Sequence, residues 1–197
     1  MTKTLYLMRH GQTLFNKRHR IQGWCDAPLT DLGVYQAQVA RQYFKNAGIT
    51  FDAAYSSTSE RACDTLEIVT NGSLPYQRVK GLKEWNFGTF EGESEDLNPP
   101  LPYEDFFVTY GGETQDQVRD RMAATILQLI QETKGKSVLM VSHGGAMANF
   151  ARAWEDNWRL DNLGHMTNCG ILKFSFEDDQ FYLEEAIGHD FSGWEEK

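Results

Sequence analysis

The chain has 197 residues, a length that one globular domain accommodates, so we expect a single domain over residues 1–197. Hydrophobic residues make up 41% of the sequence and charged residues 24%, a composition that excludes a disordered or fibrous protein. The formal net charge of -9 makes most of the surface repel polyanions. This charge argues against nucleic acid and anionic membranes as partners.

The cysteines and the N-terminus indicate a cytoplasmic protein. Cys25, Cys63 and Cys169 lie far apart, with neither the spacing of a zinc site nor the even number of a disulfide framework. The apolar stretch at residues 5–8 is followed at once by Arg9 and is too short for a signal peptide or a membrane span. We therefore expect a reducing compartment.

Short apolar runs alternate with helical patterns along the chain. Residues 4–8, 52–56 and 137–142 are apolar runs followed by polar or glycine-containing turns, as in buried parallel strands. Runs at 171–176 and 181–187 flank a polar turn and predict a β-hairpin added to the sheet.

Helical periodicity predicts helices over about 31–47, 59–70, 113–134 and 145–154, with Thr30 as a cap before the first of them. Strands and helices in alternation predict an α/β fold, a three-layer α/β/α sandwich with a mostly parallel central sheet.

The region of residues 88–112 breaks this alternation. It contains Pro99, Pro100 and Pro102 and scattered aromatic residues. A long irregular segment in a compact domain is often functional. We expect residues 88–112 to form a lid or a substrate wall.

Residues that could take part in catalysis or ligand binding follow the predicted strands. His10 and Gly11 follow the first strand, and His143 and Gly144 follow the strand at 137–142. The carboxyl ends of parallel strands meet at one sheet edge, and glycine there admits a ligand close to the backbone. Arg9 and Arg61 would bring guanidinium groups to the same edge, either as a phosphate pocket or as salt-bridge partners.

The conjunction of motifs resembles the histidine phosphatase superfamily, the phosphoglycerate mutase-like proteins. The segments LMRHGQT, QGWCDAPLTDLG, SSTSERACDT, EWNFGTFEG, GGET and VSHGG occur in the family's order and approximate spacing. The resemblance covers residue 5 to about 150 and implies the phosphoglycerate mutase-like fold.

The resemblance also implies roles for individual residues. His10 matches the family's nucleophile, which forms a phosphohistidine before water releases phosphate, and Glu84 matches the acid that protonates the leaving oxygen and then activates water. The residues that match the family's phosphate pocket are Arg9, Asn16, Arg61 and His143.

Elementary chemistry agrees with this assignment. Fixed positive donors stabilise phosphoryl transfer, and a neutral imidazole can attack in line. We expect the Nδ1–H of His10 to bond a backbone carbonyl such as that of Gly11, which leaves Nε2 free. Further candidate substrate contacts are Gln22, Gly23 and Gly144.

We expect no metal ion and no other cofactor. His10, His143 and Glu84 contain metal-ligating groups, but the flanking arginines would repel a cation.

The family contains phosphatases and mutases, and charge favours a phosphatase. Residues 84–118 contain no Lys or Arg but nine acidic residues. A mutase must hold a second anionic group, for which this segment offers no cation. We therefore predict a metal-independent phosphomonoester hydrolase that acts on a small phosphorylated metabolite. Phosphoglycerate mutase-type transfer is the alternative, and a noncatalytic phosphate-binding module is a third hypothesis. A homodimer is a further hypothesis that the sequence does not test.

Overall fold

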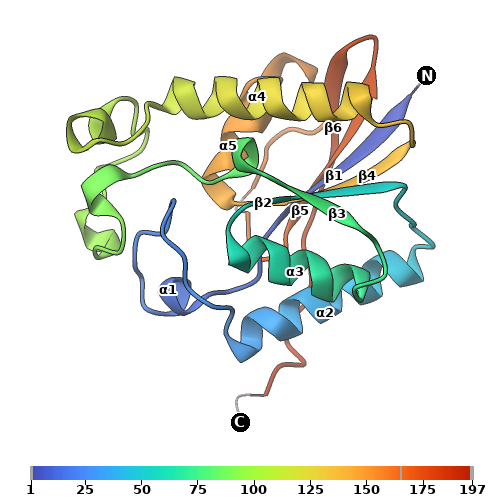
Figure 1. Cartoon of the computed structure of the whole chain (residues 1–197), viewed down its shortest axis with the longest axis horizontal. Coiled ribbons are helices and arrows are strands. Elements are labelled where there is room, and N and C mark those ends of the chain that lie inside the picture. Colours follow the sequence, from blue (N-terminus) through green and yellow to red (C-terminus); the bar gives the residue numbers. More distant parts are fainter. Residues whose placement is uncertain (1, 165, 196–197) are drawn as a thin grey trace.

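The computed structural model describes residues 2–164 and 166–195. Its strands are β1 (Lys3–Arg9), β2 (Ala53–Ser57), β3 (Tyr76–Val79), β4 (Ser137–Ser142), β5 (Ile171–Glu177) and β6 (Gln180–Ile187). They form one sheet in the order β3-β2-β4-β1-β5-β6 (Figure 1). β4 pairs parallel to β1 and β2, and β3 extends the parallel part, whereas β5 and β6 add an antiparallel hairpin. The expected mostly parallel sheet is confirmed.

The sheet carries helices on both faces, and α1 (Leu14–Lys17) lies outside it beyond the end of β1 (Figure 1). α2 (Asp31–Asn46) and α3 (Glu60–Thr70) cover one face, and α4 (Gln115–Glu132) and α5 (Gly144–Arg152) cover the other. These bounds lie within a few residues of the predicted ones. No helix in the described part of the chain has both the length and the hydropathy that crossing a membrane requires.

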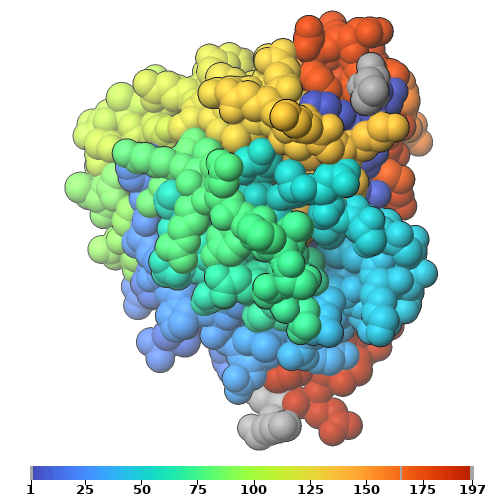
Figure 2. All heavy atoms as spheres, turned by 45° about the vertical axis from the view of Figure 1, so that its right-hand side comes forward, coloured from blue at the N-terminus to red at the C-terminus, as the bar shows by residue number. Residues whose placement is uncertain are grey.

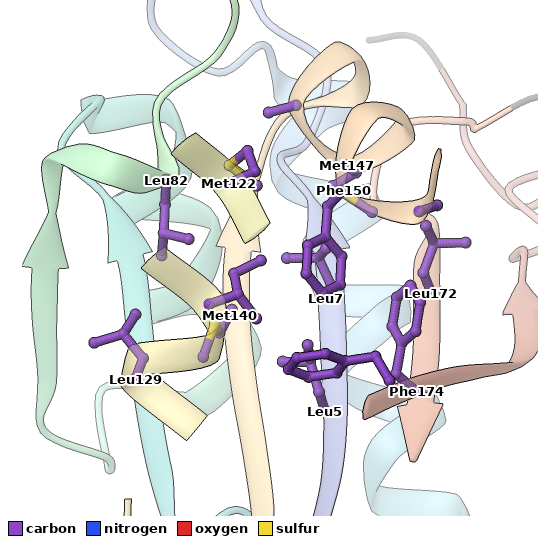
Figure 3. Close-up of a cluster of buried hydrophobic side chains, with 14 of the residues drawn as sticks. Leu5, Leu7, Leu82, Met122, Leu129, Met140, Met147, Phe150, Leu172 and Phe174 are labelled. Atoms are coloured by element: carbon purple, nitrogen blue, oxygen red, sulfur yellow. The ribbon is translucent and has the colours of Figure 1, made fainter. Parts of the chain in front are cut away.

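Side chains along β1 point alternately to the two faces of the sheet, and this explains the two apolar layers. Leu5 and Leu7 belong to the cluster under α4 and α5, whereas Tyr6 and Met8 belong to the cluster under α2 and α3. Figure 3 shows Leu5 and Leu7 packed close to Phe150 of α5 and Phe174 of β5. The sheet is therefore rigidly held on both sides beneath its carboxyl-terminal edge.

The segment 88–112 forms three short 3-10 helices, Gly88–Phe90, Glu95–Leu97 and Phe106–Tyr110. Phe107 is fully buried, with its ring centroid 4.8 Å from that of Phe87 and 5.5 Å from that of Phe90. Most of these aromatic rings therefore stabilise the segment itself.

The segment also pairs with the loop after α1. The N–H of Ile21 donates to the carbonyl of Glu93 at 2.8 Å, and the N–H of Gly92 returns a bond to Ile21 at 2.9 Å.

β3 is not predicted by the sequence patterns. It is a short edge strand whose residues are exposed or half-buried, so it lacks the apolar run that marks the other strands. Figure 2 shows the green part of the chain, to which β3 belongs, on the surface of the molecule.

Candidate active site

The strand order brings the predicted residues to one edge of the sheet. Arg9 ends β1 and lies in register with Ser142, which ends β4, so His10 and His143 follow neighbouring strand ends. A cavity of about 420 Å³ opens there. The predicted site residues that line it are Arg9, His10, Asn16, Gln22, Glu84 and Gly144. The remaining predicted residues, Gly23, Arg61 and His143, are buried beside it.

His10 is held in one tautomer. Its side chain is 4% exposed, and its Nδ1–H donates to the carbonyl of Gly11 at 2.7 Å, as the sequence predicted. Because a carbonyl can only accept, Nδ1 carries the proton and Nε2 stays free for attack. Burial, followed by the charges of Arg61 and Arg9, holds the pKa of His10 well below its usual range. The imidazole is therefore neutral at physiological pH.

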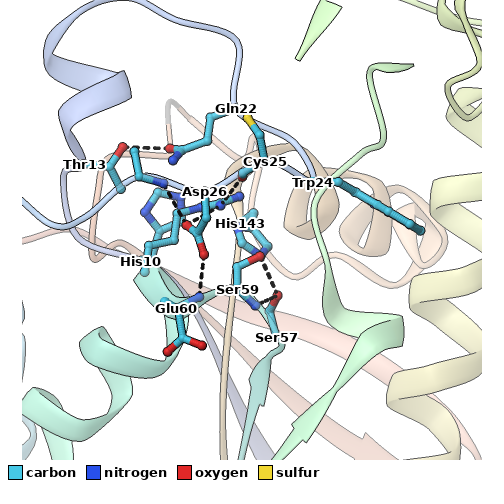
Figure 4. A network of polar contacts seen from close by, with 12 residues as sticks. His10, Thr13, Gln22, Trp24, Cys25, Asp26, Ser57, Ser59, Glu60 and His143 are labelled. Atoms are coloured by element: carbon cyan, nitrogen blue, oxygen red, sulfur yellow. Dashed lines mark hydrogen bonds and ion pairs between the residues drawn. The ribbon is translucent and has the colours of Figure 1, made fainter. Parts of the chain in front are cut away.

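His143 lies against His10 in a fully buried position (Figure 4). The two ring centroids are 5.2 Å apart, and Nε2 of His143 lies 2.8 Å from the hydroxyl of Ser57 at the end of β2. Nδ1 of His143 is buried and has no partner. Burial, then the charges of Arg61, His10 and Arg9, keeps the pKa of His143 well below its usual range.

Arg9 lines the cavity and uses only part of its guanidinium to bind the protein backbone. Its Nη1 donates to the carbonyl of Met166 at 2.6 Å, while its Nε is buried without a partner. A Cβ at Gly144 would lie 3.3 Å from that Nε, so glycine leaves the approach open. An anion in the cavity would satisfy the orphaned donor.

Arg61 is both an ion-pair partner and a candidate anion ligand. The fully buried side chain donates from Nη1 to Asp26 at 2.9 Å and to the carbonyl of Cys25 at 2.8 Å, and from Nη2 to the carbonyl of Gly23 at 2.8 Å. Its Nε has no partner. The salt-bridge hypothesis for Arg61 therefore holds for Nη1, which fixes the loop at 23–26 together with Nη2, and Nε is the atom left for the expected anion contact.

Glu91 is a site residue that the sequence analysis did not single out. Its carboxylate accepts from the N–H groups of Trp24 at 2.7 Å, Cys25 at 2.9 Å, Gly23 at 3.0 Å and Phe87 at 3.1 Å. The N–H of Gly23 is thus already occupied by a protein acceptor. Glu91 lies within the same EWNFGTFEG motif as Glu84, and its partners at 23–25 lie far away along the chain, so spacing alone offers no signal for its role.

Glu84 is held by backbone donors at the beginning of α5. Its side chain is 7% exposed and accepts from the N–H groups of Trp85 at 2.8 Å, Gly145 at 2.9 Å and Ala146 at 2.6 Å. A Cβ at Gly145 would come within 2.9 Å of a carboxylate oxygen, which explains the glycine. Arg121 donates to the backbone carbonyl of Glu84 at 3.1 Å and supports the loop from behind.

Asn16 and Gln22 are oriented by Thr13, the cap of α1. Oδ1 of Asn16 accepts from the N–H of Thr13 at 3.1 Å, and Oε1 of Gln22 accepts from the hydroxyl of Thr13 at 2.7 Å. These bonds fix the orientation of both side-chain amides, because the atoms that accept must be the oxygens. The amide nitrogens of Asn16 and Gln22 are then the groups that can donate to a ligand. Nε2 of Gln22 is buried and has no partner, and it is a neutral donor suited to an anion.

Gly11 is required by the fold as well as by the site. A Cβ there would lie 2.5 Å from the carbonyl oxygen of Gly33 in α2. The position of Gly11 after a strand predicts room for a ligand, and the structure adds close packing between two backbones.

Comparison with known proteins agrees with this geometry. The family model of the histidine phosphatase superfamily (branch 1) matches residues 5–187. A metal-independent phosphoserine phosphatase of Arabidopsis thaliana is 28% identical, over 89% of this chain and 88% of its own length. A probable phosphoglycerate mutase, GpmB, of Yersinia pestis is 33% identical, over 73% of this chain and 70% of its own length.

Solved structures show the same fold. A phosphoglycerate mutase from Bacillus anthracis superposes with a TM-score of 0.81 at 28% identity and covers 95% of this chain and 93% of its own. A phosphoserine phosphatase from Entamoeba histolytica, solved with 3-phosphoglyceric acid, gives a TM-score of 0.75 at 27% identity, over 96% of this chain and 98% of its own. The chain therefore belongs to the histidine phosphatase superfamily and has the phosphoglycerate mutase-like fold.

Proposed function

We propose that this protein hydrolyses small phosphomonoesters through a phosphorylated His10, without a metal ion. The observation that carries the proposal is the state of His10, which is neutral, fixed through Nδ1 and free at Nε2. A nucleophile of this kind needs no general base because no proton has to leave Nε2 before attack.

In the first step, Nε2 of His10 attacks the phosphorus, and the bond between phosphorus and the ester oxygen breaks. The negative charge on the transferred group faces the orphaned donors of Arg9, Arg61 and Gln22. The departing oxygen takes a proton from Glu84, which its backbone donors hold in the pocket. The products are a free alcohol and a phosphohistidine.

In the second step, the ionised Glu84 takes a proton from water, whose oxygen attacks the phosphohistidine. The bond between Nε2 and phosphorus breaks, inorganic phosphate leaves, and His10 returns to its neutral form. Acid and base are the same carboxyl group, so the cycle closes on the starting protonation states.

Charge at the leaving-group side favours water over a second phosphorylated hydroxyl as acceptor. Of the nine acidic residues in 84–118, Glu84 and Glu95 line the cavity, and Arg20 is the added cation there. Glu91 and Glu113 bind backbone N–H groups, and Glu113 also pairs with Arg121, so the acidity of the segment is partly structural. Phosphoglycerate mutase-type transfer is the second candidate, supported by the mutase relatives.

A metal-free assay tests the proposal. The purified chain in EDTA is incubated with sugar phosphates, nucleotides, phosphoglycerates and 4-nitrophenyl phosphate, beside His10→Ala. Phosphate release that is lost in His10→Ala supports the proposal, as does an acid-labile phosphoenzyme in the unaltered chain. Isomerisation of 3-phosphoglycerate with little phosphate release would support the mutase instead, and an absence of phosphoenzyme and turnover would support a binding module.

The proposal extends to the setting of the enzyme. All three cysteines are free, which supports a reducing, cytoplasmic location, and cell fractionation tests it. We also propose that residues 1–197 act as one domain in which 88–112 walls the cavity. That the chain forms a homodimer is a further hypothesis, which measuring its molar mass by light scattering tests.

A further inference from the structure

The residues that line the cavity carry orphaned polar atoms of two kinds. On Arg9 and Gln22 these atoms are donors, Nε and Nε2. On Asn98 and Asn149 they are acceptors, Oδ1 in each residue. Donors suit the phosphoryl group, and the acceptors call for a different part of the ligand.

Asn149 presents its oxygen from the inner wall. The residue is 4% exposed, and its Nδ2 donates to the carbonyl of Gly145 at 2.9 Å, one turn earlier in α5. This bond fixes the amide orientation and leaves Oδ1 as the unpaired atom. The N–H of Gly145 holds Glu84, so Asn149 lies on the side of the proposed acid, where the leaving group departs.

Asn98 contributes its oxygen from a segment far from Asn149 in the sequence. It follows the 3-10 helix Glu95–Leu97, and its own N–H donates to the carbonyl of Glu95 at 3.0 Å, which fixes the backbone there. Its Oδ1 is buried without a partner, and the residue lines the cavity together with Tyr103 and Gln115. Two separate segments of the chain thus bring orphaned acceptors to the lining of one cavity.

The charges of the cavity lining outside the proposed phosphate pocket oppose each other. Arg20 and Glu95 both line the cavity, and Glu95 also lies 3.4 Å from Nδ1 of His19. A carboxylate on the leaving group would meet Glu95 as well as Arg20, so these two residues give it little net attraction. A group that donates hydrogen bonds meets no such conflict.

We propose that the part of the cavity beside Asn98 and Asn149 is a leaving-group subsite for polyol or amino-alcohol monoesters, whose hydroxyl or ammonium hydrogens bond Oδ1 of Asn98 and Oδ1 of Asn149. The inference rests on the proposed function, since it names the substrate class of the same site. A substrate without donors leaves both acceptors buried and unpaired, and sites of this type discriminate strongly against such analogues.

The test compares substrates that differ only in donors and charge. kcat/KM is measured for glycerol 3-phosphate, O-phosphoethanolamine, n-propyl phosphate and 3-phosphoglycerate. We expect both donor substrates to exceed n-propyl phosphate by about tenfold or more, and glycerol 3-phosphate to exceed 3-phosphoglycerate.

Variants assign the preference to the two side chains. In Asn98→Ala and Asn149→Ala the ratio of glycerol 3-phosphate to n-propyl phosphate should fall by about tenfold for each acceptor removed. Asn98→Asp keeps an oxygen acceptor and adds charge, so its preference should shift toward O-phosphoethanolamine. Asn46→Ala, at an exposed asparagine near the end of α2, is the matched control and should keep the ratio of the unaltered chain.

A second readout separates this proposal from the function on which it rests. Calorimetric binding of the same ligands to His10→Ala reports the subsite without turnover. Equal affinities for glycerol 3-phosphate and n-propyl phosphate, or a ratio unchanged in both alanine variants, would overturn the subsite. Absence of hydrolysis of every ester, with the binding preference intact, would overturn the hydrolase and keep the subsite.

Discussion

Glu91→Gln is the most informative single substitution for the loop at 23–26, which lies beside the proposed phosphate pocket. The carboxylate accepts four backbone N–H groups at 2.7 to 3.1 Å, and three of them belong to residues 23–25. Glutamine keeps one oxygen and places an NH₂ where the other oxygen was. Two N–H groups then face a donor instead of an acceptor.

The expected loss follows from these contacts. A hydrogen bond to a charged acceptor contributes about 1.5–3 kcal/mol, and the half-buried loop places each lost bond at the lower end, so two lost bonds cost about 3 kcal/mol. For a chain of this size the melting temperature should fall by about 6–12 °C. Arg61 holds the carbonyls of Gly23 and Cys25, so loosening the loop should also lower kcat/KM by about tenfold.

Thermal unfolding and phosphatase kinetics check both effects. Glu93→Gln is the matched control, because it removes the same charge from an exposed side chain two residues away. If Glu91→Gln melts within about 2 °C of the unaltered chain and keeps its kcat/KM, the N–H groups are equally well satisfied by water and the reasoning is refuted.

Other predictions follow from buried groups. Because the pKa values of His10 and His143 lie well below the usual range, the unfolded chain binds protons below about pH 6.5 that the folded chain does not. The free energy of unfolding is therefore greatest above that pH and falls as the pH drops, by up to about 1.4 kcal/mol per pH unit for each histidine. Urea unfolding at several pH values should show a smaller decrease of this free energy per pH unit in His10→Ala. The same decrease in both proteins would contradict this. Gly11→Ala places a methyl group 2.5 Å from the carbonyl oxygen of Gly33 and should cost about 2 kcal/mol or more in urea unfolding, whereas an unchanged midpoint would show that the backbones can separate. Arg121→Lys removes a guanidinium that bonds one carboxylate and several carbonyls at once, so kcat/KM should fall about tenfold, and full activity would rule out a supporting role.

Local patterns were sufficient to predict most of the framework. Thr30 accepts from the N–H of Gly33 at 3.1 Å at the beginning of α2, as its position before an apolar helical stripe predicted. His10 and His143 meet because parallel strand ends share an edge, and this follows from any arrangement that makes β1 and β4 neighbours. Such features depend on residues close in sequence, or on the general rule that neighbouring parallel strands end at the same edge of a sheet.

Other features depend on contacts that no local pattern encodes. The partners of Glu91 at 23–25 lie 66 to 68 residues away, and the backbone approach of Gly11 to Gly33 needs both loops in place. The orphaned oxygen of Asn149 can be recognised only once its amide nitrogen has a partner. Contacts between residues far apart in the sequence determine the roles of Glu91, Gly11 and Asn149.

The position of β4 has a consequence for how the protein matures on the ribosome. β4 lies between β2 and β1, although it follows β2 by about eighty residues in the chain. A nascent chain that ends before residue 137 therefore contains His10 and Arg61 but has a gap in the middle of its sheet, with His143 still to be made. The proposed phosphate pocket can therefore be complete only after β4 has entered that gap, and a ligand that needs the complete pocket stabilises only chains in which β4 is in place.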